Sequence, residues 1–222
     1  MRILVIESAT EACSVALFED GALAAGSYRV IGRGHAEQLV PMIAELPGKG
    51  RADRIAVSLG PGSFTGVRIG VAAARALGLA WRVEVLGYPT LALVAAMARA
   101  THPGPVTVCM TGGHGEWFVQ DFGADGLPEH DLRSQTPAEA QHDIHYSVAA
   151  GSRARELLMF DGVGMVTLDL LPDARSFALL PHSLVSRSLA PLYGRPPDAR
   201  LPTPTLLHSR TATPSPPARA SA

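Results

Sequence analysis

The segment with the clearest potential for chemistry is a glycine loop, Leu59-Gly-Pro-Gly-Ser-Phe-Thr-Gly66, which joins an apolar run to a run of small residues. Backbone N–H groups at the start of a helix attract anions, so the loop is a candidate anion site. Its candidate residues are Gly60, Gly62, Ser63, Thr65 and Arg68. The competing interpretation, which we favour, is that the glycines only shape a tight turn from a strand into a helix.

The known phosphate-loop patterns do not fit this segment. A Walker loop requires a lysine directly after its last glycine, and no lysine lies near Gly66. A Rossmann fingerprint requires G-x-G-x-x-G, and the spacing of Gly60, Gly62 and Gly66 is one residue too long. Ser63 also lacks the G-x-S-x-G turn of a nucleophilic serine. We therefore expect no catalytic residue in the loop and no bound cofactor.

Other potentially reactive side chains do not form a complete site. His142 and His145 are three residues apart, but no further ligands accompany them, so we expect a polar helix end and not a metal site. Glu7 and Glu11 form a carboxylate pair with no evident division into acid and base.

The two cysteines, Cys13 and Cys109, are predicted to be buried thiols in strands.

The apolar periodicity predicts the elements that position these residues. A β-meander of three strands opens the chain, and helices and strands then alternate in a second, looser β/α block. The expected strands are 2–7, 12–18, 22–29, 54–59, 83–86, 106–110, 116–122, 147–150 and 163–168, and the expected helices are 35–46, 66–80, 89–100, one that begins at Thr136, and 153–158. This order predicts an α/β fold with two halves.

The helix over 66–80 is built almost entirely from small residues. Small side chains lie on nearly every side of this helix, which is more close-packing surface than one sheet can cover. The side that the sheet leaves uncovered is therefore a candidate protein–protein interface. The helix over 35–46 is amphipathic and ends before Pro47-Gly48.

Composition restricts the class of protein further. Hydrophobic residues make up 47% and charged residues 18%, and the formal net charge is −1, which provides no basic field for binding RNA alone. The sequence contains no run of about 18 apolar residues, so we expect no membrane span and a cytoplasmic protein. Residues 196–222 are rich in proline, serine, threonine and alanine, which predicts a disordered tail whose removal leaves stability nearly unchanged.

Four stretches together resemble the bacterial TsaB family, also called YeaZ. They are Ile6–Leu17, His35–Pro41, Leu59–Gly70 and Ala190–Arg195, and the string G-P-G-S-F-T-G-V-R-I-G is the most specific of them. The resemblance implies a two-lobed fold of the actin, sugar-kinase and heat-shock-ATPase (ASKHA) type with a reduced second lobe. The implied division is 1–103 for the first lobe and 104–195 for the second.

The resemblance also implies a function. The family is the non-catalytic subunit that pairs with its catalytic paralogue TsaD, and the small ATPase TsaE joins them. The paralogue transfers a threonylcarbamoyl group to adenosine 37 of tRNAs that read codons beginning with A. The chain would contact tRNA only through this complex. The same helices are also compatible with a homodimer when the chain is alone, and the sequence leaves the choice between homodimer and monomer open. The implied partner-binding residues are His35, Leu39, Met42, Gly66, Ile69, Gly70, Ala73, Ala74 and Leu77.

Two positions depart from the family pattern. Glu7 stands where the family usually has aspartate, and Gly112-Gly113 replaces an aspartate followed by a small residue. A paralogue-like HxxxH metal pair is also absent from the sequence, since His35 stands alone in its helix. The alternative function, a stand-alone ATPase, kinase or peptidase of the same fold, would need the metal ligands, phosphate loops or nucleophile that these residues do not supply.

Overall fold

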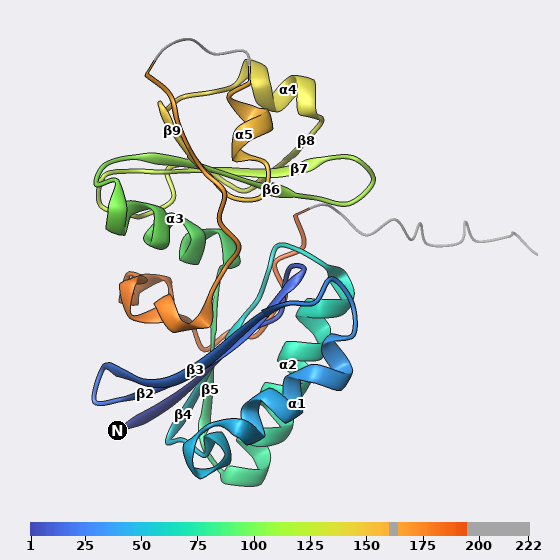
Figure 1. The fold of residues 1–222 in the computed structure, drawn as a ribbon, viewed down its shortest axis with the longest axis vertical. Coiled ribbons are helices and arrows are strands. Elements are labelled where there is room, and N and C mark those ends of the chain that lie inside the picture. The colour runs from blue at the N-terminus through green and yellow to red at the C-terminus, as the bar shows by residue number, and fades with distance from the viewer. Residues whose placement is uncertain (160–163, 195–222) are drawn as a thin grey trace, which may run out of the picture.

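The computed structural model describes residues 1–159 and 164–194, which form two lobes, each built on a five-stranded mixed sheet (Figure 1). The predicted tail over 196–222 and the segment at Arg195 lie outside the described residues.

The first lobe contains the opening β-meander. Its sheet has the spatial order β3 (Ala22–Val30), β2 (Ala12–Glu19), β1 (Arg2–Glu7), β4 (Arg54–Ser58) and β5 (Glu84–Tyr88). The first three strands are antiparallel, and β4 and β5 run parallel to β1. The central strands β1 and β4 are buried on both faces, which explains why their sequences are continuous apolar runs.

The second lobe repeats this arrangement with shorter strands. Its sheet has the order β8 (Arg133–Gln135), β7 (Trp117–Phe122), β6 (Val106–Thr111), β9 (Val148–Ala150) and β10 (Val166–Leu168). Strands β6, β7 and β8 form an antiparallel meander, and β9 and β10 lie parallel to β6. The two sheets therefore share one connectivity, and the second lobe is the smaller copy.

Helices cover both sheets in layers. Helices α1 (His35–Glu45) and α2 (Phe64–Trp81) pack on the outer face of the first sheet, while α4 (Pro137–His142) and α5 (Ala154–Leu157) pack on the outer face of the second (Figure 1). Helix α3 (Thr90–Thr101) lies between the sheets, buried along most of its length. Val5 and Ala56 of the first sheet share one apolar core with Val108 of the second.

The chain returns to the first lobe after β10. The short 3₁₀ helix Ala174–Leu179 packs between the lobes, and the Ala174 N–H donates to the Ser14 hydroxyl over 2.9 Å. A β-bridge then joins Ser186 to Gly87. The proposed lobe boundary at residue 103 remains a prediction, since both α3 and this returning segment contact the two lobes.

The sequence prediction of the elements holds with local differences. Strand β8 and the 3₁₀ helix at Ala174–Leu179 were not predicted, because three-residue strands and single 3₁₀ turns have no periodicity to detect. Helix α5 has only four residues, shorter than predicted. Among the described residues, no helix combines the length and apolar character needed to cross a membrane.

Candidate functional site

The glycine loop is shaped by its close approach to the end of β1. A Cβ at Gly62 would lie 2.0 Å from the Ala9 carbonyl oxygen, and one at Gly66 would lie 2.2 Å from the Ser8 carbonyl oxygen. The Ser63 N–H donates to the Ala9 oxygen over 2.6 Å. Only glycine permits contacts this short, so packing alone explains two of the loop glycines.

Ser63 caps the helix that follows. Its hydroxyl accepts a hydrogen bond from the Gly66 N–H at 3.2 Å, which satisfies one of the donors that a helix start leaves unpaired. Thr65 is exposed within the first turn and is not the cap. Of the two hydroxyls at the start of α2, the structure thus uses Ser63 as the cap.

Arg68 lies one turn into α2 and joins an aromatic cluster. Its guanidinium carbon is 3.6 Å from the centroid of the Phe64 ring, and its Nε donates to the Tyr193 hydroxyl over 3.3 Å. The Phe64 and Tyr193 rings are 5.3 Å apart between centroids. Arg68 therefore ties the returning chain to the start of α2. Whether it also binds an anion remains a prediction.

An inter-lobe cleft of about 750 Å³ opens beside this loop. Its first-lobe wall comes from the turn after β1 and the start of α2, and its second-lobe wall comes from the β6–β7 turn, Phe118 and Ser152. The returning chain at 192–194 closes one side. Of the anion-site candidates, the lining includes Gly62, Ser63 and Arg68, while Gly60 and Thr65 are not among its residues.

The two carboxylates singled out in the sequence have different environments. Glu11 is part of the cleft lining. Glu7 is fully buried, and its Oε1 accepts hydrogen bonds from the Ala9 N–H and the Ser58 hydroxyl, each 2.7 Å long. Burial raises the pKa of Glu7 to about 7, although these hydrogen bonds oppose the shift. The two carboxyl groups thus do not share one solvated site.

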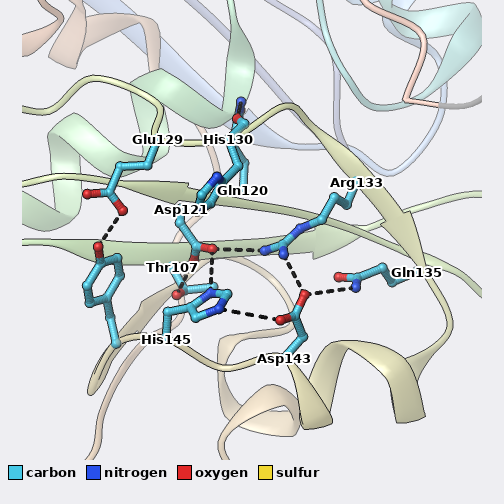
Figure 2. A network of polar contacts seen from close by, with 10 residues as sticks. Thr107, Gln120, Asp121, Glu129, His130, Arg133, Gln135, Asp143 and His145 are labelled. Atoms are coloured by element: carbon cyan, nitrogen blue, oxygen red, sulfur yellow. Dashed lines mark hydrogen bonds and ion pairs between the residues drawn. The ribbon is translucent and has the colours of Figure 1, made fainter.

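The histidine pair is separated by the end of α4. His142 is the last residue of that helix, whereas His145 joins a polar network on the outer face of the second sheet (Figure 2). The His145 Nδ1 lies 2.9 Å from the Asp121 carboxylate, which is fully buried. Arg133 bridges Asp121 and Asp143. The network fixes β8 and the segment after α4 to the sheet.

Thr107 completes the network by donating to Asp121 over 2.6 Å. Among residues 1–159 and 164–194, no group of three or more histidine, cysteine or acidic side chains could hold a metal ion. Sequence reasoning missed Asp121 and Arg133, because only the pairing of β7 with β8 brings them together.

The predicted partner-binding residues divide by burial. His35, Leu39, Met42, Gly66, Gly70 and Ala74 are buried within the chain, while Ile69, Ala73 and Leu77 are half-buried. The small residues Gly66, Gly70 and Ala74 of α2 therefore face their own sheet: a Cβ at Gly70 would lie 2.4 Å from the Ser8 hydroxyl oxygen. Partner binding by these nine residues remains a prediction.

The surface that the two helices leave outward, here called the outer helix face, consists of other residues. Its members are Ala36, Glu37, Val40, Pro41, Ala44 and Glu45 of α1 and Arg68, Ala72, Arg75, Ala76, Leu79 and Ala80 of α2. Val40 is 58% exposed and Leu79 is 83% exposed. The sequence already indicates that Val40 and Leu79 are exposed, because neither residue falls at the spacing of the apolar residues that its helix buries.

Comparisons with known proteins find relatives whose names all refer to threonylcarbamoylation of tRNA. Residues 29–127 match the family described as "TsaD: tRNA N6-adenosine threonylcarbamoyltransferase". The chain is 42% identical over 100 residues to the tRNA threonylcarbamoyladenosine biosynthesis protein TsaB of Escherichia coli, and 34% identical over 107 residues to that of Haemophilus influenzae. These alignments cover 43% and 46% of this chain and 43% and 45% of the relatives, so the chain matches less than half the length of either.

Longer matches support the same assignment. A tRNA N6-adenosine threonylcarbamoyltransferase of Anaeromyxobacter sp. is 29% identical over 79% of this chain and 58% of its own length. The structure of YeaZ from Pseudomonas aeruginosa aligns with a TM-score of 0.73 at 26% identity, over 86% of this chain and 99% of that one. The predicted fold class, two-lobed and actin-like, is thereby confirmed. Together, these matches support the TsaB family, also called YeaZ, as the family that this chain resembles.

Proposed function

We propose that this protein is the non-catalytic subunit of the machinery that makes threonylcarbamoyladenosine at position 37 of tRNAs reading codons that begin with A. It acts by pairing with a TsaD-like transferase, and a TsaE-like ATPase joins the pair. Support comes from its resemblance to the TsaB family and from the names of its TsaB relatives. The protein meets tRNA only within the complex, in the cytoplasm.

The observation that carries the proposal is the outer helix face. Val40 and Leu79 expose large aliphatic side chains on two neighbouring helices, whose other exposed residues include several alanines. Small and aliphatic residues allow a second pair of helices to approach closely, which favours a helical bundle with a partner.

Charge distinguishes the two helices of this face. The exposed charged residues of α1 are Glu37 and Glu45, whereas those of α2 are Arg68 and Arg75. A partner of the same fold that places its basic helix against α1 and its acidic helix against α2 would pair opposite charges across the interface. The same pattern allows a homodimer when the partner is missing, because a second copy of the chain carries complementary helices.

Charge substitutions on the outer helix face test the proposal. Val40→Glu and Leu79→Glu should fold normally, because both side chains are exposed, yet each should weaken co-purification with the TsaD-like paralogue roughly tenfold or more by placing an unpaired charge in the interface. Met159→Glu is the matched control, since Met159 is 62% exposed on the other lobe. Wild-type affinity in both helix variants would overturn the proposal.

A further inference from the structure

Glu7 has an unusual hydrogen-bonding pattern for a buried acid. The Ala9 N–H and the Ser58 hydroxyl both donate to Oε1, each at 2.7 Å. The second oxygen, Oε2, is buried and has no hydrogen-bond partner among the described residues. A buried polar atom in this state is costly, and far more so when it carries charge.

The groups around Glu7 do not balance a negative charge. Nearby groups are Cys13 from β2, Ser58 from β4 and Tyr88 from β5. Burial first, and the charge of Glu7 second, raise the pKa of both the thiol and the phenol. More remote charges, Arg29 and Asp173, act on Cys13 and Tyr88 respectively. Burial favours the neutral carboxylic acid and brings the pKa of Glu7 to about 7, against the hydrogen bonds of Ala9, Ser58, Ser8 and Tyr88, which favour the carboxylate.

The Glu7 side chain also hydrogen-bonds to a residue that lines the inter-lobe cleft. Ala9 donates to Glu7 from one side and accepts the Ser63 N–H from the other, and Ala9 itself lines the cleft. The neighbouring Ser8 hydroxyl donates to the Gly66 carbonyl over 3.0 Å. Glu7 thus hydrogen-bonds directly to the Ser8–Ala9 turn. That turn is itself hydrogen-bonded to the glycine loop and to the first turn of α2.

We propose that Glu7 is a proton-controlled latch beneath the inter-lobe cleft. As the neutral acid it keeps the Ser8–Ala9 turn and the glycine loop packed, and after losing its proton to solvent it loosens both, because the carboxylate draws water onto Oε2. This device is independent of the proposed function, since it requires no partner.

The sign of the pH dependence follows from the raised pKa. Well below pH 4.5 the acid is neutral in both the folded and unfolded states, and its contribution to stability is fully present. Between pH 4.5 and about 7 the folded state binds more protons than the unfolded state, so the contribution falls as pH rises. From well below pH 4.5 to well above pH 7, the folding equilibrium constant should fall by about 300-fold in all on account of Glu7.

The test uses the full chain with Glu7→Gln, which keeps the shape and an acceptor oxygen but cannot ionise, and with Glu11→Gln as the matched control on the same turn. Amide hydrogen exchange, corrected for intrinsic rates, is measured between pH 5.5 and 8 at Ala9, Ser63 and Gly66. Wild type and Glu11→Gln should lose protection about tenfold or more at the higher pH. Glu7→Gln should show no such loss.

Carbon NMR titration of the Glu7 carboxyl in the unmodified protein provides a second readout that needs no variant. A midpoint near neutral pH supports the latch. A midpoint below pH 5 overturns it, as does protection at these amides that does not change with pH, or that changes equally in Glu7→Gln.

Discussion

Gly70 of α2 rests on Ser8 of the first lobe so closely that a Cβ at Gly70 would lie 2.4 Å from the Ser8 hydroxyl oxygen. The same hydroxyl donates to the Gly66 carbonyl, so it cannot turn aside without losing that hydrogen bond. Gly66 and Gly70 thus allow α2 to pack closely on its own sheet.

This contact predicts the effect of enlarging Gly70. Gly70→Ala should lower the free energy of unfolding by about 1–3 kcal/mol, despite the better helix propensity of alanine, and Gly70→Leu should prevent normal folding. Urea denaturation measures both. Ala72→Leu, on the exposed side of the same helix, is the control and should change stability by less than about 0.5 kcal/mol. A Gly70→Leu protein as stable as wild type would show that α2 can shift away from the sheet.

The cap of α2 gives a second prediction. Ser63→Ala should cost about 1 kcal/mol, because the Gly66 N–H loses its acceptor. Thr65→Ala should be nearly neutral, since Thr65 is exposed and does not cap the helix. Thermal denaturation of the two variants side by side distinguishes them, and equal losses would mean that the cap assignment is wrong.

The polar network of the second lobe gives a third. Arg133→Met leaves the fully buried Asp121 without its guanidinium partner, and breaking such a pair costs about 3–5 kcal/mol. His142→Gln, at the nearby end of α4, is the control and should change little. Stability is measured by denaturant titration. If Arg133→Met matches the control, then Thr107 and His145 alone satisfy the carboxylate.

The alternative of a stand-alone enzyme makes an opposite prediction in an ATPase assay. We expect no ATP hydrolysis by the purified chain above that of a mock preparation. The reason is that the cleft offers a single carboxylate among the described residues. Glu7 is buried and hydrogen-bonded, and Glu11 is the one acidic side chain among the described residues that line the cleft. Turnover that disappears in Glu11→Gln would establish catalysis in the cleft and remove the non-catalytic assignment.

Local sequence patterns were sufficient for most of the elements. The apolar runs at Ile3–Ile6 and Ile55–Val57 predicted buried strands, and the spacing of Leu39, Met42 and Ile43 predicted α1, because strand and helix periodicities are properties of adjacent residues. The capping box at Thr136 and Glu139 was visible in part, from the threonine and the proline that follows it.

The sequence by itself therefore determined the order of the elements, the two-part α/β architecture and the resemblance to the TsaB family, all of which depend on residues close together in the chain. Only the tertiary structure decided which face of α2 is spare, that Ser8 lies beneath Gly70, that Asp121 meets Arg133, and that Glu7 is buried while Glu11 lines the cleft. These relationships join residues from different strands and helices, and burial and close approach are set by the packing of whole layers, which local periodicity does not encode.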